Sequence, residues 1–374
     1  MSESRLVIGC MSGTSIDALD AALVDISGEG LAMQASVVRC ASRPLGELAP
    51  RLRAIAEQEP FRAGEMADAA RELGLLHLKL LRRLIGNDRV SFIAVHGQTV
   101  FHQPPVSWQL INPAPIAYGL GAPVVYDLRA ADLSLGGQGA PITPLADFIL
   151  FRSESETRTF VNLGGFVNVT RIHKGRDAAD VKSWLGLVSG CDVCACNQLL
   201  DRLARDLLGV PFDRDGKAAA KGRVVKELQT TLHGLLRAQS VARRSLGTGD
   251  VLADWFKEYR HAPKPEDILR TACTAIAATI VTGRKSDRLI LAGGGVKNKT
   301  LLDEIKARSS AAVSLSDEFG VPAAYREAIA MAVLGALCQD RVPITLSQVT
   351  GAVNPPVAGC WVIPIKNYEL GIAN

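Results

Sequence analysis

Short apolar runs along this chain alternate with polar or glycine-containing turns. Residues 6–10 and 21–26 are apolar runs of strand length, and the polar segment 11–17 lies between them. Two such runs separated by a tight polar segment predict a β-hairpin. The same strand–glycine–strand pattern returns at residues 159–170, after the polar break 153–156. The sequence therefore predicts two hairpins of one design, which is a weak internal repeat.

Other apolar patterns predict a long helix and further strands. Apolar side chains recur at helical spacing between residues 60 and 84, so one face of this helix is expected to pack on a sheet. A strand is expected at 35–41. Three more runs, 91–95, 123–126 and 289–292, each end in polar or glycine-rich residues. Because α/β sheets bind ligands at the carboxyl ends of their strands, these ends are candidate binding sites.

Length and composition limit the possible classes of protein. The 374 residues are too many for one ordinary core, so two domains are expected, 1–150 and 151–374, with the last helix and strands of the second packing back on the first. With 48% hydrophobic and 21% charged residues, a net charge of +4 and no basic run, neither a membrane nor a nucleic acid is expected as a partner. The first residues lead directly into a strand and leave no room for a signal peptide, so a cytoplasmic location is expected.

The turn of the first hairpin has the composition of a phosphate-binding turn. Gly13 lets a ligand approach the backbone closely. Ser12, Thr14 and Ser15 supply hydroxyl groups beside backbone N–H donors. Asp17 would repel phosphate unless a divalent cation lay between them or the carboxylate faced another substrate. On this segment alone, an ordinary β-turn remains the alternative.

Two later glycine segments strengthen the case for nucleotide binding. Gly164 and Gly165 form the turn of the second hairpin, and Gly293–Gly295 follow the strand at 289–292. A helix is predicted to begin near Asn298, and its N-terminal N–H groups would face the same region. Each turn alone is a weak signal, whereas the three in this order are a strong one.

Polar side chains after two of the predicted strands are candidates for binding a second ligand. His96 and Gln98 follow one strand, and Arg129 follows another. A guanidinium binds carboxylate or phosphate through two hydrogen bonds, so Arg129 is the natural anchor for an anion. Alternatively, Arg129 forms a structural ion pair with Asp127 or Asp132, and His96 caps a turn.

Three of the eight cysteines lie close together in the sequence. Cys191, Cys194 and Cys196 could ligate zinc, but no second Cys or His pair follows at a recognisable ligand spacing. Core packing is therefore the favoured interpretation, and any metal ligands of the protein remain unassigned.

The turns at 12–15, 162–165 and 293–295 resemble, in this order, those of the actin, Hsp70 and sugar-kinase superfamily. That resemblance implies an α/β fold with two ribonuclease-H-like (actin-like ATPase) domains and an interdomain cleft. Over essentially its full length, the chain is more closely similar to the anhydro-N-acetylmuramic acid kinase family. The similar segments are 8–25, 96–99, 136–141, 161–170, 213–216, 293–298, 317–322, 327–328 and 349–352.

The family resemblance implies a specific reaction. It implies that ATP and water act on 1,6-anhydro-N-acetylmuramic acid, opening the anhydro bridge and phosphorylating O6 to give N-acetylmuramic acid 6-phosphate in peptidoglycan recycling. Mg²⁺ is expected with ATP, with Asp17 or Asp20 near enough to order its waters. A homodimer is implied by the resemblance alone. The residues expected to contact ATP are Gly13, Thr14, Ser15, Asp17, Asp20, Gly164, Gly165, Gly293, Gly294, Gly295 and Asn298.

The resemblance also implies catalytic and sugar-binding residues. The family motif D-T-G-P-G-N matches residues 192–197, so Asp192 corresponds to the general base that activates water. Glu327 matches a catalytic-site carboxylate near the sugar. The residues expected to bind the sugar are His96, Gln98, Arg129 and Asn197. The alternative for Asp192 is a helix N-cap, with the helix starting at Asn197.

Three segments depart from the family pattern, all on the side that would bind the sugar. The motif's T-G-P-G is replaced by residues 193–196, its P-P-K-S-T-G-R-E by 243–250, and its I-G-D-P by 110–113. Replacing two glycines restricts a turn that needs positive φ or close ligand contact. The alternatives are therefore a kinase for another anhydrosugar, such as levoglucosan, or a nucleotide-binding homologue without catalysis.

Overall fold

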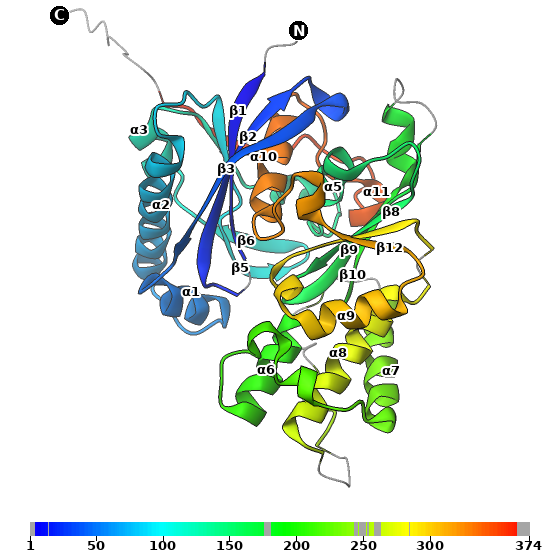
Figure 1. Cartoon of the computed structure of the whole chain (residues 1–374). Coiled ribbons are helices and arrows are strands. Elements are labelled where there is room, and N and C mark those ends of the chain that lie inside the picture. Colours follow the sequence, from blue (N-terminus) through cyan, green and yellow to red (C-terminus); the bar gives the residue numbers. More distant parts are fainter. Residues whose placement is uncertain are drawn as a thin grey trace, which may run out of the picture. The chain divides into compact units, whose positions relative to one another are not determined.

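The computed structural model describes residues 4–13, 15–175, 181–242, 246, 252, 254–257, 263–283 and 285–364 (Figure 1). The chain divides into two compact units, Met1–Ile149 with Glu327–Asn374, and Leu150–Arg326. The segment from Glu327 onward is thus grouped with the first unit. From the sequence, residues 151–374 were assigned to the second domain, with only its last helix and strands expected to pack on the first. Thr14 lies outside the described residues, as does the stretch 243–250 apart from Leu246.

The first unit is built on a six-stranded sheet with the order β13-β7-β4-β1-β2-β3. The predicted hairpin is confirmed, because β1 and β2 pair antiparallel from Arg5 opposite Ile26 to Ser12 opposite Leu19. β3 continues the antiparallel series, β4 and β7 run parallel to β1, and β13 closes the other edge antiparallel. The strands are β1 (Arg5–Ser12), β2 (Ala18–Ser27), β3 (Gln34–Pro44), β4 (Phe92–Val95), β7 (Val124–Tyr126) and β13 (Cys360–Val362).

Helices cover both faces of this sheet. Ile8 and Cys10 join a core with the apolar face of α2 (Ala63–Ile85), which is the helix predicted at 60–84. Gly9 points to the opposite face, because side chains alternate along a strand. There it meets α10 (Arg326–Gln339), and a Cβ on Gly9 would lie 1.9 Å from the Ala328 carbonyl oxygen. Only glycine allows this helix to lie so close to β1.

Smaller elements complete the first unit. A separate two-stranded sheet, β5 with β6, follows β4 directly and carries several of the candidate residues. Within the described part of the chain, no helix is both long and apolar enough to cross a membrane. The remaining elements are α1 (Leu48–Ala56), β5 (Gln98–Gln103), β6 (Val106–Leu110), α3 (Ala114–Leu120), α4 (Ala130–Ser134), α5 (Pro144–Phe151) and α11 (Ser347–Thr350).

The second unit repeats the same topology with five strands in the order β10-β9-β8-β11-β12. As in the first unit, three antiparallel strands come first in the chain, and two strands parallel to the first of them follow. The predicted α/β fold with two ribonuclease-H-like units is confirmed. The elements are β8 (Arg158–Leu163), β9 (Phe166–Ile172), β10 (Val188–Ala195), α6 (Asn197–Leu208), α7 (Lys226–Ala242), α8 (Pro265–Val281), β11 (Arg288–Ala292), α9 (Lys299–Arg308) and β12 (Ala312–Leu315).

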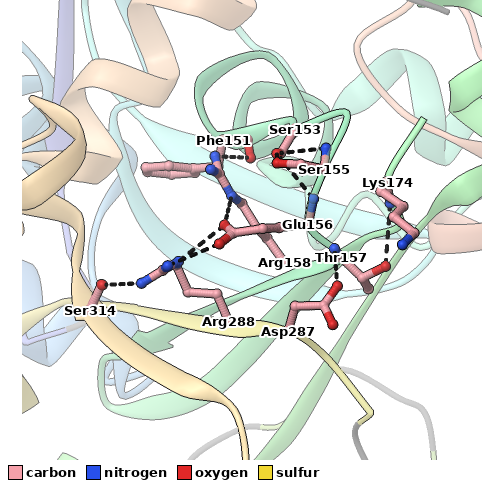
Figure 2. Close-up of polar contacts among 10 residues, drawn as sticks. All are labelled: Phe151, Ser153, Ser155, Glu156, Thr157, Arg158, Lys174, Asp287, Arg288 and Ser314. Carbon is pink, nitrogen blue, oxygen red and sulfur yellow. Dashed lines mark hydrogen bonds and ion pairs between the residues drawn. The ribbon is translucent and has the colours of Figure 1, made fainter. Parts of the chain in front are cut away.

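Ion pairs hold the edge of the second sheet at which its parallel strands begin (Figure 2). Arg288 Nη2 lies 2.9 Å from Glu156 Oε1, and Arg158 Nε lies 3.0 Å from Glu156 Oε2. Arg288 also donates from Nη1 to Ser314 Oγ at 2.9 Å. These side chains tie together the starts of β8, β11 and β12. The glycine turns at 164–165 and 293–295 lie at the opposite edge, where β8 and β11 end.

Candidate active site

The first glycine turn is closed by local hydrogen bonds and anchored by a buried residue. The Ile16 N–H donates to the Gly13 carbonyl at 3.1 Å, and the Ile16 side chain is buried. Ser15 Oγ donates to Asp17 Oδ1 at 2.6 Å, and the Ala18 N–H donates to the same oxygen at 2.9 Å. Ser15 and Asp17 are exposed. The turn therefore presents a hydroxyl and a carboxylate to solvent from a fixed backbone.

Asp20 is placed differently from Asp17. It lies inside β2, opposite Met11 of β1, and is half-buried rather than part of the turn. Its charge raises the pKa of the Cys40 thiol, after the larger effect of burial. Of the two carboxylates considered for ordering Mg²⁺, the structure places only Asp17 in the turn itself.

The turn that follows β4 lies directly beside the first glycine turn. Ser12 Oγ donates to the Gly97 carbonyl, and Gln98 Nε2 donates to the Gly13 carbonyl, both at 3.4 Å. This proximity follows from the sheet, because β1 and β4 are parallel neighbours whose carboxyl ends meet at one edge. A predicted phosphate turn and a predicted sugar-binding segment thus contact each other within one unit.

Arg129 is held by a neutral histidine and a carbonyl. Its Nε donates to His96 Nε2 at 3.1 Å, and its Nη1 donates to the Gly139 carbonyl at 2.6 Å. His96 must therefore carry its proton on Nδ1, which donates to the Gly97 carbonyl at 2.9 Å. Burial, reinforced by the charge of Arg129, lowers the pKa of His96 to about 3. His96 consequently orients the guanidinium as a neutral acceptor, a larger role than a turn cap.

The carboxylates near Arg129 hold backbone and hydroxyl groups. Asp127 Oδ1 accepts from the Ala130 N–H at 3.2 Å. The fully buried Asp132 accepts from the Gly139 N–H and from Thr350 Oγ1, both at 2.8 Å. Asp132 thereby fixes the loop whose Gly139 carbonyl binds Arg129.

In the second unit, the turn at Gly164 and Gly165 lies against the start of α6. Their carbonyls accept from the N–H groups of Asn197 at 3.1 Å, Cys196 at 2.9 Å and Gln198 at 3.2 Å. Asn197 Nδ2 also donates to the carbonyl of Leu163 at 2.9 Å. The side chain of Asn197, predicted to bind sugar, thus supports the turn predicted to bind phosphate.

The third glycine segment contacts the same turn. Gly293 has φ +86°, and a Cβ there would lie 2.5 Å from Asn162 Oδ1. A Cβ on Gly295 would lie 2.7 Å from Leu163 Cβ and 3.1 Å from Asn197 Oδ1. Gly293 is required both by its positive φ and by the lack of space for a Cβ, and Gly295 by the lack of space alone. The structure therefore brings Gly164, Gly165, Asn197 and Gly293–Gly295 together in one unit.

Asn298 caps the helix that follows these glycines. Its Oδ1 accepts from the Leu301 N–H at 3.0 Å, which confirms the predicted helix start. Gly216 approaches it so closely that a Cβ there would lie 2.2 Å from Asn298 Oδ1, and Thr300 Oγ1 donates to the Gly216 carbonyl at 2.8 Å. The segment 213–216 is thus joined to the third glycine segment.

Asp192 lies in a strand, so the interpretation as a helix N-cap is wrong. It occupies β10 beside a β-bulge, and its Oδ2 accepts from the Leu246 N–H at 3.0 Å. The helix begins at Asn197, as expected, but its N-cap residue is Cys196. Because bulges re-aim side chains, the bulge and the Leu246 N–H together orient this carboxylate.

The altered residues after Asp192 belong to the core of the second unit. All four residues from 193 to 196 are fully buried among apolar side chains. Cys196 has φ −134°, which is outside the left-handed region that favours glycine. Burial raises the pKa of its thiol well above the ordinary value. No group of three or more potential metal ligands occurs among the residues whose placement is described.

Glu327 lies in the first turn of α10, next to Ala328, whose carbonyl lies against Gly9 of β1. His102, which was not among the residues expected from the sequence, lies on β5, where burial and then the charge of Arg129 lower the pKa of its ring to about 4. Its position four residues after Gln98, next to the matching segment 96–99, was the available signal.

Comparisons with known proteins agree over nearly the whole chain. The family model described as "Anhydro-N-acetylmuramic acid kinase" matches residues 5–363. Three relatives carry the same description. The one from Bordetella pertussis is 34% identical over 377 residues, covering 95% of each chain. The one from Salinibacter ruber is 32% identical and covers 96% of each chain. The one from Bacillus cereus is 28% identical and covers 96% of this chain and 99% of the relative.

Proposed function

Because the chain belongs to the anhydro-N-acetylmuramic acid kinase family, we propose that it converts 1,6-anhydro-N-acetylmuramic acid, ATP and water into N-acetylmuramic acid 6-phosphate and ADP. The family match over residues 5–363 is the observation that carries this proposal. We further assign the reaction to peptidoglycan recycling in the cytoplasm.

Asp192 is the general base of the proposed reaction. A water molecule is a poor nucleophile until a carboxylate accepts its proton. The activated water forms a bond to C1 while the C1–O6 bond breaks, and O6 then accepts the γ-phosphoryl group as ADP leaves. The hydrogen bond from the Leu246 N–H supports this role, because it fixes the position of one carboxylate oxygen.

The sugar is bound by residues that the structure holds in defined positions. Gln98 lies beside the first glycine turn, and Arg129 is oriented by His96. In this proposal Arg129 binds the anionic lactyl group, because its guanidinium matches a carboxylate. Glu327 contacts the sugar as the second carboxylate, and Asn197 contributes from the start of α6.

ATP is bound by the three glycine segments, and Mg²⁺ accompanies it. Gly13 and Ser15 contact phosphate in the first unit, as do Gly164 and Gly165 in the second, and the glycines at 293–295 with Asn298 contact adenosine. The exposed Asp17 fits a magnesium site, because Mg²⁺ usually takes only one or two carboxylates besides phosphates and waters. The ion supplies charge neutralisation on the phosphates when bound.

A coupled ADP-release assay tests the function. With 1,6-anhydro-N-acetylmuramic acid, wild-type protein should release ADP, and Asp192→Asn should lower kcat by about 10²–10⁴-fold, as is typical for loss of a general base. The variant should still bind ATP in calorimetry. Asp206→Asn, which removes an exposed carboxylate of α6 paired with Arg202, is the matched control and should retain activity.

Other outcomes would contradict the proposal in distinct ways. Release of ADP only with levoglucosan would identify another anhydrosugar as substrate. No release with any anhydrosugar would indicate a nucleotide-binding protein without this catalysis. Full activity of Asp192→Asn would remove Asp192 from the mechanism.

A further inference from the structure

One aromatic ring of the second unit lies against residues next to both passages of the chain between the two units. The chain leaves the first unit after Ile149 and returns to it after Arg326. Phe151 stacks on Phe160 of β8, with the ring centroids 5.0 Å apart and an angle of 12° between the planes. Arg326 Cζ lies 4.3 Å from the centroid of the same Phe160 ring. Phe160 therefore contacts the chain both at the end of α5 and at the start of α10.

The ring of Phe160 is buried on the face of the second sheet that lies away from the helical core. Val161 and Leu163 of β8 belong to the apolar core that includes side chains of α6 and α8. Because side chains alternate along a strand, Phe160 points to the opposite face. Phe151, Phe160 and Arg326 are each at most 1% exposed. The Arg326 guanidinium is thus shielded from water, which strengthens the attraction between a cation and the face of an aromatic ring.

Further contacts hold the ring that stacks on Phe160. Arg158 Nη1 donates to the Phe151 carbonyl at 3.1 Å (Figure 2). The Arg158 guanidinium also lies over Phe319, with Cζ 4.8 Å from the ring centroid. Phe319 meets Phe151 edge-on, with the ring centroids 6.1 Å apart. The stacked rings of Phe151 and Phe160 therefore form a fixed support on which Arg326 rests.

The residue that follows Arg326 is Glu327, the carboxylate proposed to contact the sugar. Glu327 lies in the first turn of α10, between two neighbours that are both held. On one side, Arg326 lies over Phe160. On the other side, the carbonyl of Ala328 lies against Gly9 of β1. A functional group must be held within roughly 0.5 Å of its productive position, which requires neighbours that are themselves locked by packing.

We propose that Phe160 and Arg326 are positioning residues, whose contact sets the place of the Glu327 carboxylate against the bound anhydrosugar. This inference rests on the proposed function. Without the ring, Arg326 can adopt other rotamers, and the first turn of α10 loses one of its supports. The backbone hydrogen bonds of β8 do not depend on this ring, so the turn at Gly164 and Gly165 should still bind ATP.

A double-mutant cycle measures whether Phe160 acts through Glu327. The sugar Kd is measured by calorimetry with 1,6-anhydro-N-acetylmuramic acid in the absence of ATP. Phe160→Leu should raise this Kd about 5-fold, and Glu327→Gln should raise it at least as much. In the Glu327→Gln background, Phe160→Leu should change the sugar Kd by less than about two-fold, because the group through which it acts has been removed. The Kd for ATP should stay within about two-fold of wild type in every variant.

Phe319→Leu is the matched control for loss of an aromatic ring. It removes another ring of the same cluster, which lies under Arg158 instead of Arg326, so the sugar Kd should stay at the wild-type value. The midpoint of thermal unfolding shows whether each variant is folded. If Phe160→Leu does not fold, Arg326→Lys takes its place in the cycle, because lysine keeps the positive charge but not the planar guanidinium. It should raise the sugar Kd about 3-fold in wild-type protein and leave it unchanged in Glu327→Gln.

Three results would overturn the inference. The first is an unchanged sugar Kd in folded Phe160→Leu. The second is an equal rise with and without Glu327→Gln, which would indicate a general structural effect, and the third is an equal rise in Phe319→Leu. If Glu327→Gln raises the sugar Kd but Phe160→Leu does not, only this inference fails. If Glu327→Gln leaves the sugar Kd unchanged, the assignment of Glu327 to the sugar fails with it, and if wild-type protein binds no anhydrosugar, the proposed function fails too.

Discussion

Gly9 allows α10 to lie against β1, and its replacement by alanine should be strongly destabilising. A Cβ at this position would lie 1.9 Å from the Ala328 carbonyl oxygen and 2.4 Å from the Ala332 nitrogen. Ordinary contact begins at 3.4 Å, so the helix would have to retreat by about 1.5 Å. Both clashing atoms belong to the backbone, so no change of rotamer relieves the contact.

The cost follows from what the helix buries. Every residue of α10 from 328 to 334 is at most 1% exposed, and a retreat would remove their contacts with the sheet. Overpacking usually costs 1–3 kcal/mol, and a clash between two backbones lies at the upper end, at about 3 kcal/mol. For a unit of this size, that lowers the midpoint of thermal unfolding by roughly 6–12 °C.

Scanning calorimetry measures the lowered midpoint of thermal unfolding. ADP release shows whether the displacement of α10 also disturbs Glu327, the proposed sugar-binding carboxylate at its start. Gly64→Ala is the matched control, because Gly64 is exposed in the first turn of α2 with no atom within 4 Å of the added Cβ. That substitution should leave the midpoint unchanged or raise it slightly, since alanine favours helix. A Gly9→Ala midpoint within 2 °C of wild type would refute the proposed packing between β1 and α10.

Two other predictions concern buried or paired carboxylates. Hydrogen bonds from Arg288 lower the pKa of the Glu156 carboxyl to about 2, whereas its unfolded-state value is near 4.5. The charged Glu156 therefore stabilises the fold above pH 4.5, and this stabilisation is lost as the pH falls from 4.5 toward 2. Because the carboxylate is partly exposed, we expect it to contribute about 1 kcal/mol or less. Glu156→Gln should make the free energy of unfolding, measured in urea, less dependent on pH in that range, whereas the control Glu154→Gln should not (Figure 2). Identical pH profiles of Glu156→Gln and wild type would show that the ion pair does not cause the pH dependence. Thr350→Val removes the hydroxyl that donates to the fully buried Asp132, so we expect the free energy of unfolding in urea to fall by about 1–3 kcal/mol. Ser347→Ala, which removes a nearby exposed hydroxyl, is the control. A loss in Thr350→Val no larger than in this control would show that the hydroxyl does not stabilise Asp132.

The local elements could be predicted from the sequence because their causes are local. The apolar runs on either side of residues 11–17 form the predicted β1–β2 hairpin, and the helix expected near Asn298 begins where that side chain caps it. The spacing of apolar residues between 60 and 84 likewise predicted α2, which begins at Ala63. Periodicity and capping act within a few residues, so the sequence displays them directly.

Contacts between distant segments could not be predicted in this way. Nothing near residue 129 indicates that His96 accepts from Arg129, or that Asp132 binds Thr350, because these partners meet only once the sheet has formed. The alternative of an N-cap at Asp192 was wrong because β10 continues to Ala195 before α6 begins. Buried residues such as Val193 extend the strand, and tertiary packing outweighed the local capping signal.

The division of the chain into units has a consequence for biosynthesis. The second unit is continuous, whereas the first needs both Met1–Ile149 and the segment from Glu327 onward. During translation, β1 emerges early, but α10, which covers Gly9, emerges only after the whole of the second unit. The first unit therefore cannot complete its fold before the second unit has been synthesised, unlike the usual order in which the N-terminal domain folds first. Until α10 arrives, the nascent chain exposes an apolar sheet face that a holdase-type chaperone could protect.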